Sequence, residues 1–493
     1  MTHTASPSPI GSIGLHAGST AAPASRASWL ERYSWALYDF ANTIWSMNIG
    51  SLYFTAWLVK DLGSSNSAVA WGTALSSLLM AVSAPVFGAI SDDRRRRKPW
   101  VVWFTIISCV ATAMIGWIGT HGGVPLYGES VMGGATRPES YHIGGAPLVM
   151  IVFAFTVASY CYQAAQPFYN AMLPDLVPPE ELGRLSGIGT AIGYIGTIFG
   201  LLLVAPFFDG SLPHIGGIPE RFLRVPEGLM RWLHLIPTTS TGGRVATFAP
   251  TALLFLLFSL PIFLFFRDRN PAPAGTKVDW RRAFTEVRQT LRDAREHPGT
   301  LRFILASLIY QDAMGTVVFA LGLYAIQAVG FSQGEATSVY IALAVPAIIG
   351  SYVSGRLVDK FGSKRTLVGV LVGWSVLLVT MAFFPGRAAF WTIGSMIGLV
   401  FGGVPAAERP LLLSLVPEKD AGRFFSLMLL SSRAGSFLGP VVWAITVDGL
   451  EPRLGTQVAY RAALLTVAVF FAASLIVLRG VPNKRGKAAL ATV

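Results

Sequence analysis

Long apolar runs alternate with short polar stretches along almost the whole chain, and this pattern predicts membrane-spanning helices. A helix needs about 20 mainly apolar residues to cross a bilayer. Twelve runs meet that requirement, and several contain Gly, Pro or polar residues. The predicted spans are 34–58, 68–91, 99–120, 147–170, 185–207, 247–266, 300–328, 335–358, 365–384, 389–413, 423–446 and 459–479. We therefore expect an all-α membrane protein with twelve transmembrane helices.

Two pairs of similar segments predict that the second half of the chain repeats the first. Gly88-Ala-Ile-Ser-Asp92, followed by basic residues, returns as Gly355-Arg-Leu-Val-Asp359. Leu176-Val-Pro before Gly183-Arg184 returns as Leu415-Val-Pro before Gly422-Arg423. Each segment joins two predicted spans at the same place in its half. The economical interpretation is two pseudo-symmetric bundles of six helices each.

The basic residues predict how the chain lies in the membrane. Cytoplasmic loops carry an excess of Lys and Arg. With a cytoplasmic N-terminus, 27 of the 38 cations lie on the cytoplasmic side. We thus expect a multi-pass protein of the cell membrane, the inner membrane in a Gram-negative cell, with both termini inside.

This topology predicts five parts, and two of them contain a short surface helix. The parts are a disordered tail at 1–33, a six-helix bundle at 34–266, a cytoplasmic linker at 267–299, a second bundle at 300–479 and a tail at 480–493. In the linker, Trp280 to Glu296 has the pattern of a basic amphipathic helix on the inner leaflet. The outer loop 208–246 contains apolar residues around Trp232 that suggest an interfacial helix or lid. A solvated connector remains the simpler alternative for both the linker and the outer loop.

Composition and charge exclude several other classes. Only 13% of residues are charged, against about 25% in soluble domains. The net charge of +12 is concentrated in short loops without a nucleic-acid-binding motif, so we expect no nucleic acid partner. The two cysteines, Cys109 and Cys161, fall inside apolar runs, and no nucleotide loop or metal motif is present. We expect a monomer without cofactors or metals, and not an enzyme.

The repeated basic loops and the six-plus-six pattern resemble the major facilitator superfamily of transporters. Within it, the chain is most similar to the vacuolar-effluxer-like, or unknown major facilitator, family. The matching motifs run from the first to the eleventh span and include Trp35-Ala-Leu-Tyr-Asp39-Phe-Ala-Asn42, Tyr169-Asn170, Tyr310-Gln-Asp312 and Phe437-Leu-Gly-Pro440. A fungal member is associated with amino-acid export from the vacuole, so the resemblance implies transport of a small solute. The segment around Asp39 is also similar to cation-coupled glycoside–pentoside–hexuronide symporters, where such an acid helps bind the coupling cation.

Ionisable residues inside the predicted spans are the first candidates for function. Each costs about 2.5–3.5 kcal/mol to insert. Asp39, Asp312 and Glu408 are candidate proton-coupling groups, and fixed ion pairs that lock helices together are the alternative. Arg409 and Arg433 are candidate ligands for a substrate carboxylate, or charge partners for these acids.

Polar residues at helical spacing predict where a solute binds. The resemblance implies that the first, fourth, seventh and tenth spans line a central cavity. Tyr38-Asp39 and Tyr310-Gln311-Asp312 occupy equivalent spans of the two halves and suggest a pseudo-symmetric pair. The candidate solute-binding residues are Tyr38, Asn42, Ser46, Tyr162, Gln163, Gln166, Tyr169, Asn170, Tyr310, Gln311, Thr316, Arg409 and Arg433.

The repeated loops are candidates for a cytoplasmic gate. In the resembled fold, such an aspartate pairs with the basic run and the neighbouring helix when the transporter is open outward. The cations also serve as topology signals, and we expect both roles. The gate residues are Gly88, Asp92, Arg94, Arg96, Gly355, Asp359, Lys364 and Arg365.

The sequence as a whole predicts a secondary active transporter that works by alternating access. The expected cargo is a small polar solute such as an amino acid, and the expected coupling ion is a proton or sodium. A sugar or glycoside cation symporter is one alternative. A non-transporting assembly factor or sensor with the same fold is another. Neither the direction of transport nor symport against antiport follows from the sequence.

Overall fold

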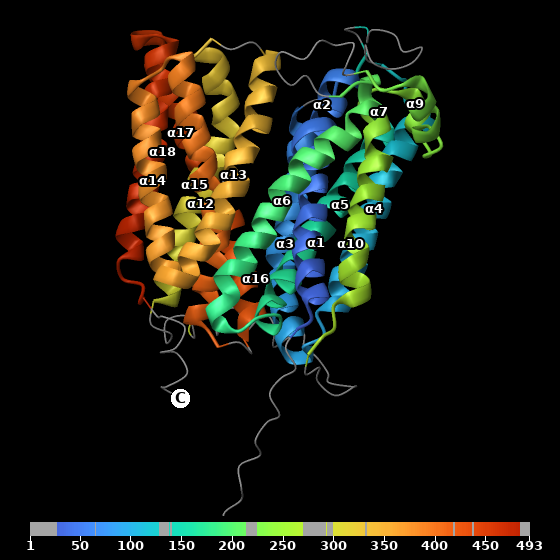
Figure 1. Cartoon of the computed structure of the whole chain (residues 1–493). Helices are drawn as coiled ribbons and strands as arrows, with labels where there is room; N and C mark the ends of the chain where they lie inside the picture. The colour runs from blue at the N-terminus through green and yellow to red at the C-terminus, as the bar shows by residue number, and fades with distance from the viewer. Residues whose placement is uncertain are drawn as a thin grey trace, which may run out of the picture.

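The computed structural model is an almost entirely helical bundle (Figure 1). It describes residues 27–64, 66–127, 138, 141–212, 224–269, 292, 299–330, 333–417, 420–435 and 438–483. Residues 1–26 of the predicted tail 1–33, residues 484–493 of the predicted tail 480–493 and nearly all of the predicted linker helix at Trp280 to Glu296 lie outside these residues. The prediction of a disordered tail as far as residue 33 is wrong, because helix α1 already begins at Trp29. Helices are present at all twelve predicted ranges. Eight helices of the described chain are long and apolar enough to cross a membrane.

The first half of the chain contains six long helical segments. The first segment is α1 (Trp29–Trp45), continued by a π-helical stretch (Ser46–Tyr53), α2 (Phe54–Ala56) and a second π-helical stretch (Trp57–Asp61). The others are α3 (Asn66–Arg94), α4 (Lys98–His121), α5 (Gly145–Ala171), α6 (Leu182–Val204) and α10 (Phe248–Phe265). Two short helices, α7 (Pro206–Asp209) and α9 (Glu227–Leu233), lie in the predicted outer loop.

The second half contains the corresponding six. They are α12 (Thr300–Gln327), α13 (Gln333–Phe361), α14 (Ser363–Phe383), α15 (Arg387–Leu415), α16 (Ala421–Gly435) with α17 (Leu438–Leu454), and α18 (Thr456–Leu478). The predicted span 423–446 covers parts of α16 and α17, which flank residues 436–437 outside the described chain. The first predicted span contains π-helical turns. Such turns occur often at functional sites.

The helix α1 begins five residues before the predicted span because a capping box fixes its start. The Ser28 hydroxyl accepts the backbone N–H of Glu31 at 3.2 Å. The Glu31 carboxylate in turn accepts the backbone N–H of Ser28 at 2.8 Å. Two otherwise unpaired amides are satisfied by this exchange, so the helix starts at Trp29.

Each half has its own apolar core, and aromatic stacking is prominent in both. In the first half, Phe54 and Phe155 stack with ring centroids 3.8 Å apart. In the second half, Trp374 and Phe471 stack at 5.1 Å. Buried Cys109 and Cys161 are free thiols within the first bundle. Each core is therefore built almost entirely from residues of one half.

The two halves pack against each other mainly through α6 with α13 and α3 with α16. Close approaches are concentrated near the repeated loops, at the lower end of Figure 1, which we call the basic end. There a Cβ atom on Gly187 would come within 2.7 Å of the Gly355 Cα atom. A Cβ atom on Gly88 would come within 2.8 Å of the Arg423 Cα atom. Only glycine allows the backbones of the two halves this close.

Candidate functional site

A buried ion pair joins the two halves. Arg409 on α15 donates from Nη1 to the Asp39 Oδ2 atom on α1 at 3.0 Å, and from Nη2 to Oδ1 at 3.4 Å. The two side chains are only 14% and 11% exposed. The arrangement is the two-pronged contact that a guanidinium makes with a carboxylate. It brings together two residues that the sequence placed 370 positions apart.

Two aromatic rings pack beside the Arg409 guanidinium. The guanidinium carbon lies 5.7 Å from the ring centroids of both Trp35 and Tyr169. These rings stack on each other at 4.7 Å. The Trp35 indole N–H donates to the Tyr169 carbonyl oxygen, and the Tyr169 hydroxyl donates to the Trp35 carbonyl oxygen. Cation–π attraction therefore supplements the Asp39 charge in holding Arg409.

The neighbouring acid, Glu408, is held by α12. The Tyr310 hydroxyl donates to Glu408 Oε1 and the Gln311 amide to Oε2, both at 2.7 Å. Three predicted site residues are thus brought together inside the second half. Glu408 is thus hydrogen-bonded to Tyr310 and Gln311. The adjacent Arg409 is hydrogen-bonded to Asp39 instead.

Asp312 directly follows Gln311 on α12 but contacts a different helix. Its Oδ2 atom accepts the backbone N–H of Gly439 at 2.7 Å, close to the start of α17. Its Oδ1 atom is buried and has no hydrogen-bond partner among the described residues. Thr316 donates to the Asp312 carbonyl oxygen. Asp39 on α1 and Asp312 on α12, predicted as a pseudo-symmetric pair, therefore have unlike partners.

Three amide side chains near α1 and α5 have unused hydrogen-bonding capacity. Both polar atoms of Asn42, one turn beyond Asp39, are buried without a partner within the described part of the chain. The same holds for Gln163 Oε1 and Asn170 Oδ1 on α5. Buried polar atoms are nearly always paired in proteins, with water if not with protein. These atoms are therefore well suited to bind water or a polar solute.

The remaining predicted solute-binding residues have local contacts. The Tyr38 hydroxyl pairs with Thr105 at 2.7 Å, and Tyr162 stacks on Trp45. The Ser46 hydroxyl donates to a carbonyl oxygen of its own helix. Gln166 is half-buried on α5. The side chain of Arg433 lies outside the described residues, so its predicted role stays a prediction.

Three of the predicted gate residues, Gly88, Gly355 and Asp359, lie against the opposite half at the basic end. The Asp359 Oδ1 atom, just past the predicted span 335–358, accepts the backbone N–H of Arg184 at 3.2 Å. The carboxylate thereby satisfies an orphan amide at the start of α6. Desolvation in this contact raises the pKa of Asp359 to about 6, although part of the residue stays exposed. The carboxyl is still mainly ionised at pH 7.

The basic part of the predicted gate makes other contacts. Lys364 donates to carbonyl oxygens of Arg479 and Val481 at the end of α18. Arg96 and Arg365 are exposed. The side chains of Asp92 and Arg94 lie outside the described residues.

Sequence reasoning missed several residues that support the site. Arg97 forms an ion pair with Asp175 at 2.8 Å and links the first basic loop to the turn before α6. Asp268 accepts the backbone N–H groups of Arg97 and Lys98 and caps the start of α4. Trp35, which packs beside the Arg409 guanidinium, was also missed because it carries no charge. Its position one helical turn before Asp39 was the available signal.

Gly189 on α6 supports Asp39 by leaving room for it, and this gives a first prediction. A Cβ atom there would lie 2.8 Å from the Trp35 ring and 3.1 Å from Asp39 Oδ2. We expect Gly189→Ala to displace the ion pair and to lower transport at least several-fold, because overpacking costs about 1–3 kcal/mol. Gly193→Ala is the matched control, since its Cβ atom would meet Asp39 at an ordinary 3.5 Å. Equal transport by the two variants, measured as solute flux into proteoliposomes, would contradict this role.

Comparison with known proteins identifies the class to which this helical bundle belongs. The chain belongs to the Major Facilitator Superfamily, whose family model matches residues 37–332. A second family model, Vacuole effluxer Atg22 like, matches residues 237–491, in agreement with the resemblance seen in the sequence. The chain is therefore a membrane transporter of the Atg22-like kind rather than an enzyme.

Individual relatives agree with this assignment over most of the chain. The MFS-type transporter YxiO of Bacillus subtilis (strain 168) is 23% identical over 92% of this chain and 94% of its own length. Autophagy-related protein 22 of Eremothecium gossypii is 20% identical over 72% of this chain and 70% of its own. Among solved structures, the fucose:proton symporter FucP of E. coli superposes with a TM-score of 0.63 at 14% identity. That match covers 91% of this chain and 96% of FucP.

Proposed function

We propose that the protein moves a small polar solute by alternating access and that proton binding controls the ion pair between its halves. The observation that carries the proposal is the Asp39–Arg409 pair, because it is buried and joins two separately packed bundles. Breaking a buried pair by neutralising one partner costs about 3–5 kcal/mol. That is enough to change which arrangement of the two bundles is preferred.

In this proposal the structure corresponds to an outward-facing state. The close contacts between the halves lie at the basic end, which the distribution of cations predicts to be cytoplasmic. One structure of the similar transporter FucP is described as being in the outward conformation. In the proposal, loss of the Asp39 charge releases Arg409, so one of the contacts that hold the two halves together weakens.

The solute binds, in the same proposal, where amide groups lack partners and where Arg409 can change partner. Asn42, Gln163 and Asn170 supply hydrogen-bonding atoms that the described protein leaves unused. A solute carboxylate can replace the Asp39 carboxylate on the two-pronged guanidinium. An amino acid or a similar organic acid supplies both kinds of group, which supports this class of substrate.

The coupling is tested by solute-driven proton movement in proteoliposomes that contain a pH-sensitive dye. Candidate amino acids, organic acids and sugars are screened first by thermal shift, since ligand binding raises apparent stability. We expect the wild type to move protons with its solute, and Asp39→Asn and Asp312→Asn to lose most of that movement. The proposal fails if both variants keep wild-type coupled flux. If solute flux depends on a sodium gradient and not on pH, proton coupling is ruled out and sodium is the coupling ion.

A sugar is the second candidate cargo, and one observation favours it. The fold matches FucP, whose printed description is a fucose:proton symporter, over 91% of the chain. Neutral amides and phenols near α5 also suit hydroxyl groups. A substitution of Arg409 distinguishes the two candidate substrates. Arg409→Lys loses the two-pronged contact and therefore weakens binding of a carboxylate solute far more than that of a neutral sugar.

A further inference from the structure

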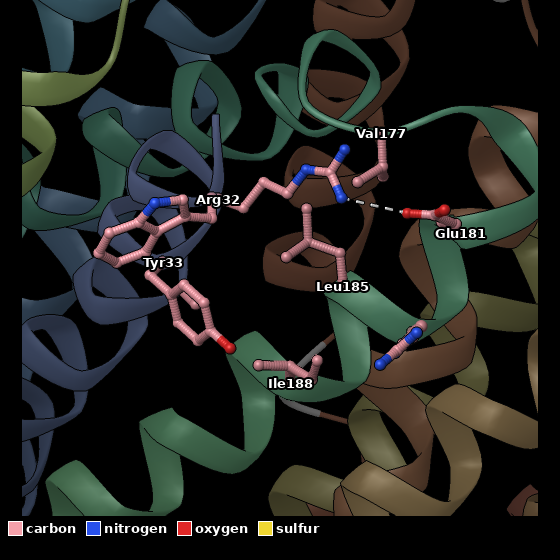
Figure 2. Close-up of a pocket in the computed structure, with 9 residues that line it drawn as sticks. Arg32, Tyr33, Val177, Glu181, Leu185 and Ile188 are labelled. Carbon is pink, nitrogen blue, oxygen red and sulfur yellow. Dashed lines mark hydrogen bonds and ion pairs between the residues drawn. The ribbon is translucent and has the colours of Figure 1, made fainter. Parts of the chain in front are cut away.

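A small groove lies between the starts of α1 and α6, apart from the ion pair between the halves (Figure 2). Its volume is about 190 Å³, below the range of about 300–1,000 Å³ usual for drug-sized ligands. Figure 2 shows Arg32 and Glu181 along one side and Tyr33 with Ile188 on the other. The groove therefore suits a compact polar group rather than a large solute.

The charges around this groove favour an anion. Arg32 and Arg184 are both at its wall, against the single carboxylate of Glu181. Arg32 Nη1 contacts Glu181 Oε2 at 3.3 Å, while Arg32 Nε is buried without a hydrogen-bond partner among the described residues. The side chain of Arg184 is exposed. Two arginines that line one groove, one of them with an unused donor, are well suited to a phosphate group.

The surroundings of the groove are typical of a membrane interface. Trp29 and Tyr33 line it and are 70% and 58% exposed. Such rings with one polar end gather where lipid headgroups meet the acyl chains. The protein leaves both rings mostly uncovered. Their position therefore suits contact with a lipid surface.

An apolar stripe continues from the groove along α6. It starts with Leu185 and Ile188 in the groove wall and goes on through Ile192 and Ile195, which are half-buried, to Phe199, which is 50% exposed. The spacing of three or four residues places this stripe on one face of the helix. An acyl chain attached to a headgroup in the groove has a continuous apolar surface to follow. A free anion gains nothing from such a stripe.

We propose that this groove binds the headgroup of an anionic phospholipid from the bilayer leaflet at the basic end, with Arg32 and Arg184 on its phosphate and an acyl chain along α6. The occupant is a lipid rather than a soluble phosphate because the aromatic rim and the apolar stripe adjoin the two arginines. The lipid then contacts the first turns of both helices. Arg184 is also the residue whose backbone N–H donates to Asp359 across the halves. The bound headgroup thus lies next to a contact that alternating access must break.

Native mass spectrometry of the detergent-purified full chain tests the proposal with two lipids of identical acyl chains. Phosphatidylglycerol is the anionic probe and phosphatidylcholine the zwitterionic one. We expect the wild type to prefer phosphatidylglycerol, and the double variant Arg32→Gln/Arg184→Gln to bind it roughly 25-fold more weakly, since each basic residue at an anionic surface contributes a factor of about five. Arg365→Gln, another exposed arginine at the basic end, is the matched control and should bind like wild type.

A variant that is expected to bind phosphatidylglycerol more tightly shows that weaker binding by the double variant is not caused by misfolding. Glu181→Gln removes the competing carboxylate and frees Arg32, so phosphatidylglycerol should bind several-fold more tightly. The proposal is overturned if the double variant binds like the Arg365→Gln control, or if phosphatidylcholine binds the wild type equally well. It is also overturned as a lipid site if inorganic phosphate at millimolar concentration displaces phosphatidylglycerol completely, because the groove then takes a free anion.

Discussion

Replacement of Asp39 by Asn should destabilise the packed arrangement of the two halves by about 3–5 kcal/mol, because it leaves the Arg409 guanidinium buried and uncompensated. The side chains are too well buried for water to replace the lost charge, at 14% exposure for Arg409 and 11% for Asp39. The halves should therefore separate more often at the basic end. Spin labels on α6 and α13 report this separation as a longer distance in pulsed electron resonance.

A double-mutant cycle distinguishes a specific pair from general damage. Asp39→Asn and Arg409→Gln should each be strongly destabilising, while the double variant, which has no unpaired charge, should be less destabilised than the sum of the two. Coupling energies of about 0.5–3 kcal/mol are usual for residues in contact. Simple additivity would show that the two side chains act independently and would remove the basis of the proposed mechanism.

An ion pair within one half supplies the control. Arg244 and Asp61 are 2.6 Å apart, and Asp61 is 7% exposed. Asp61→Asn removes a carboxylate of comparable burial but does not connect the bundles. Its thermal stability should fall while the distance between α6 and α13 stays as in the wild type. If Asp39→Asn and Asp61→Asn give the same distance distribution, the Asp39–Arg409 pair does not control the arrangement of the halves.

The fold was largely predictable because membrane insertion imposes a strong pattern on sequence. Apolar runs of about 20 residues are required for each span, and every predicted range contains helix. The irregularities were not predictable in the same way. The π-helical stretches Ser46–Tyr53 and Trp57–Asp61 depend on how neighbouring helices pack, and hydropathy does not record packing.

The ionisable residues of the site were predictable, whereas their partners were not. The high cost of an intramembrane charge singles out Asp39, Asp312 and Glu408 from the sequence alone. Pairing depends on distances between helices that are far apart in the chain. The sequence left open whether Arg409 binds substrate or an acid, and the structure gives its contact to Asp39. Asp312 was predicted as the counterpart of Asp39, yet it accepts a backbone N–H group near the start of α17.

The glycines at the contact between α6 and α13 give the second large prediction. A Cβ atom on Gly187 would lie 2.7 Å from both the Gly355 Cα atom and the Ser351 carbonyl oxygen, across the contact between α6 and α13. Both are backbone atoms, so rotation of a side chain cannot relieve the clash. Gly187→Val should therefore push the halves apart at the basic end. A cost of about 1–3 kcal/mol changes the ratio of two conformations by about 5- to 150-fold.

Cysteine labelling at the same contact measures this shift. Ser186 donates to the Pro405 carbonyl oxygen across the halves and is fully buried, so a cysteine placed there is protected while the halves are packed. In a background without Cys109 and Cys161, Gly187→Val should speed its reaction with a polar maleimide at least several-fold. Gly369→Val on α14 is the matched control, because a Cβ atom there meets nothing within 4 Å. Equal labelling rates in the two variants would mean that the backbones can separate without this contact, and the glycines would then serve folding rather than the gate.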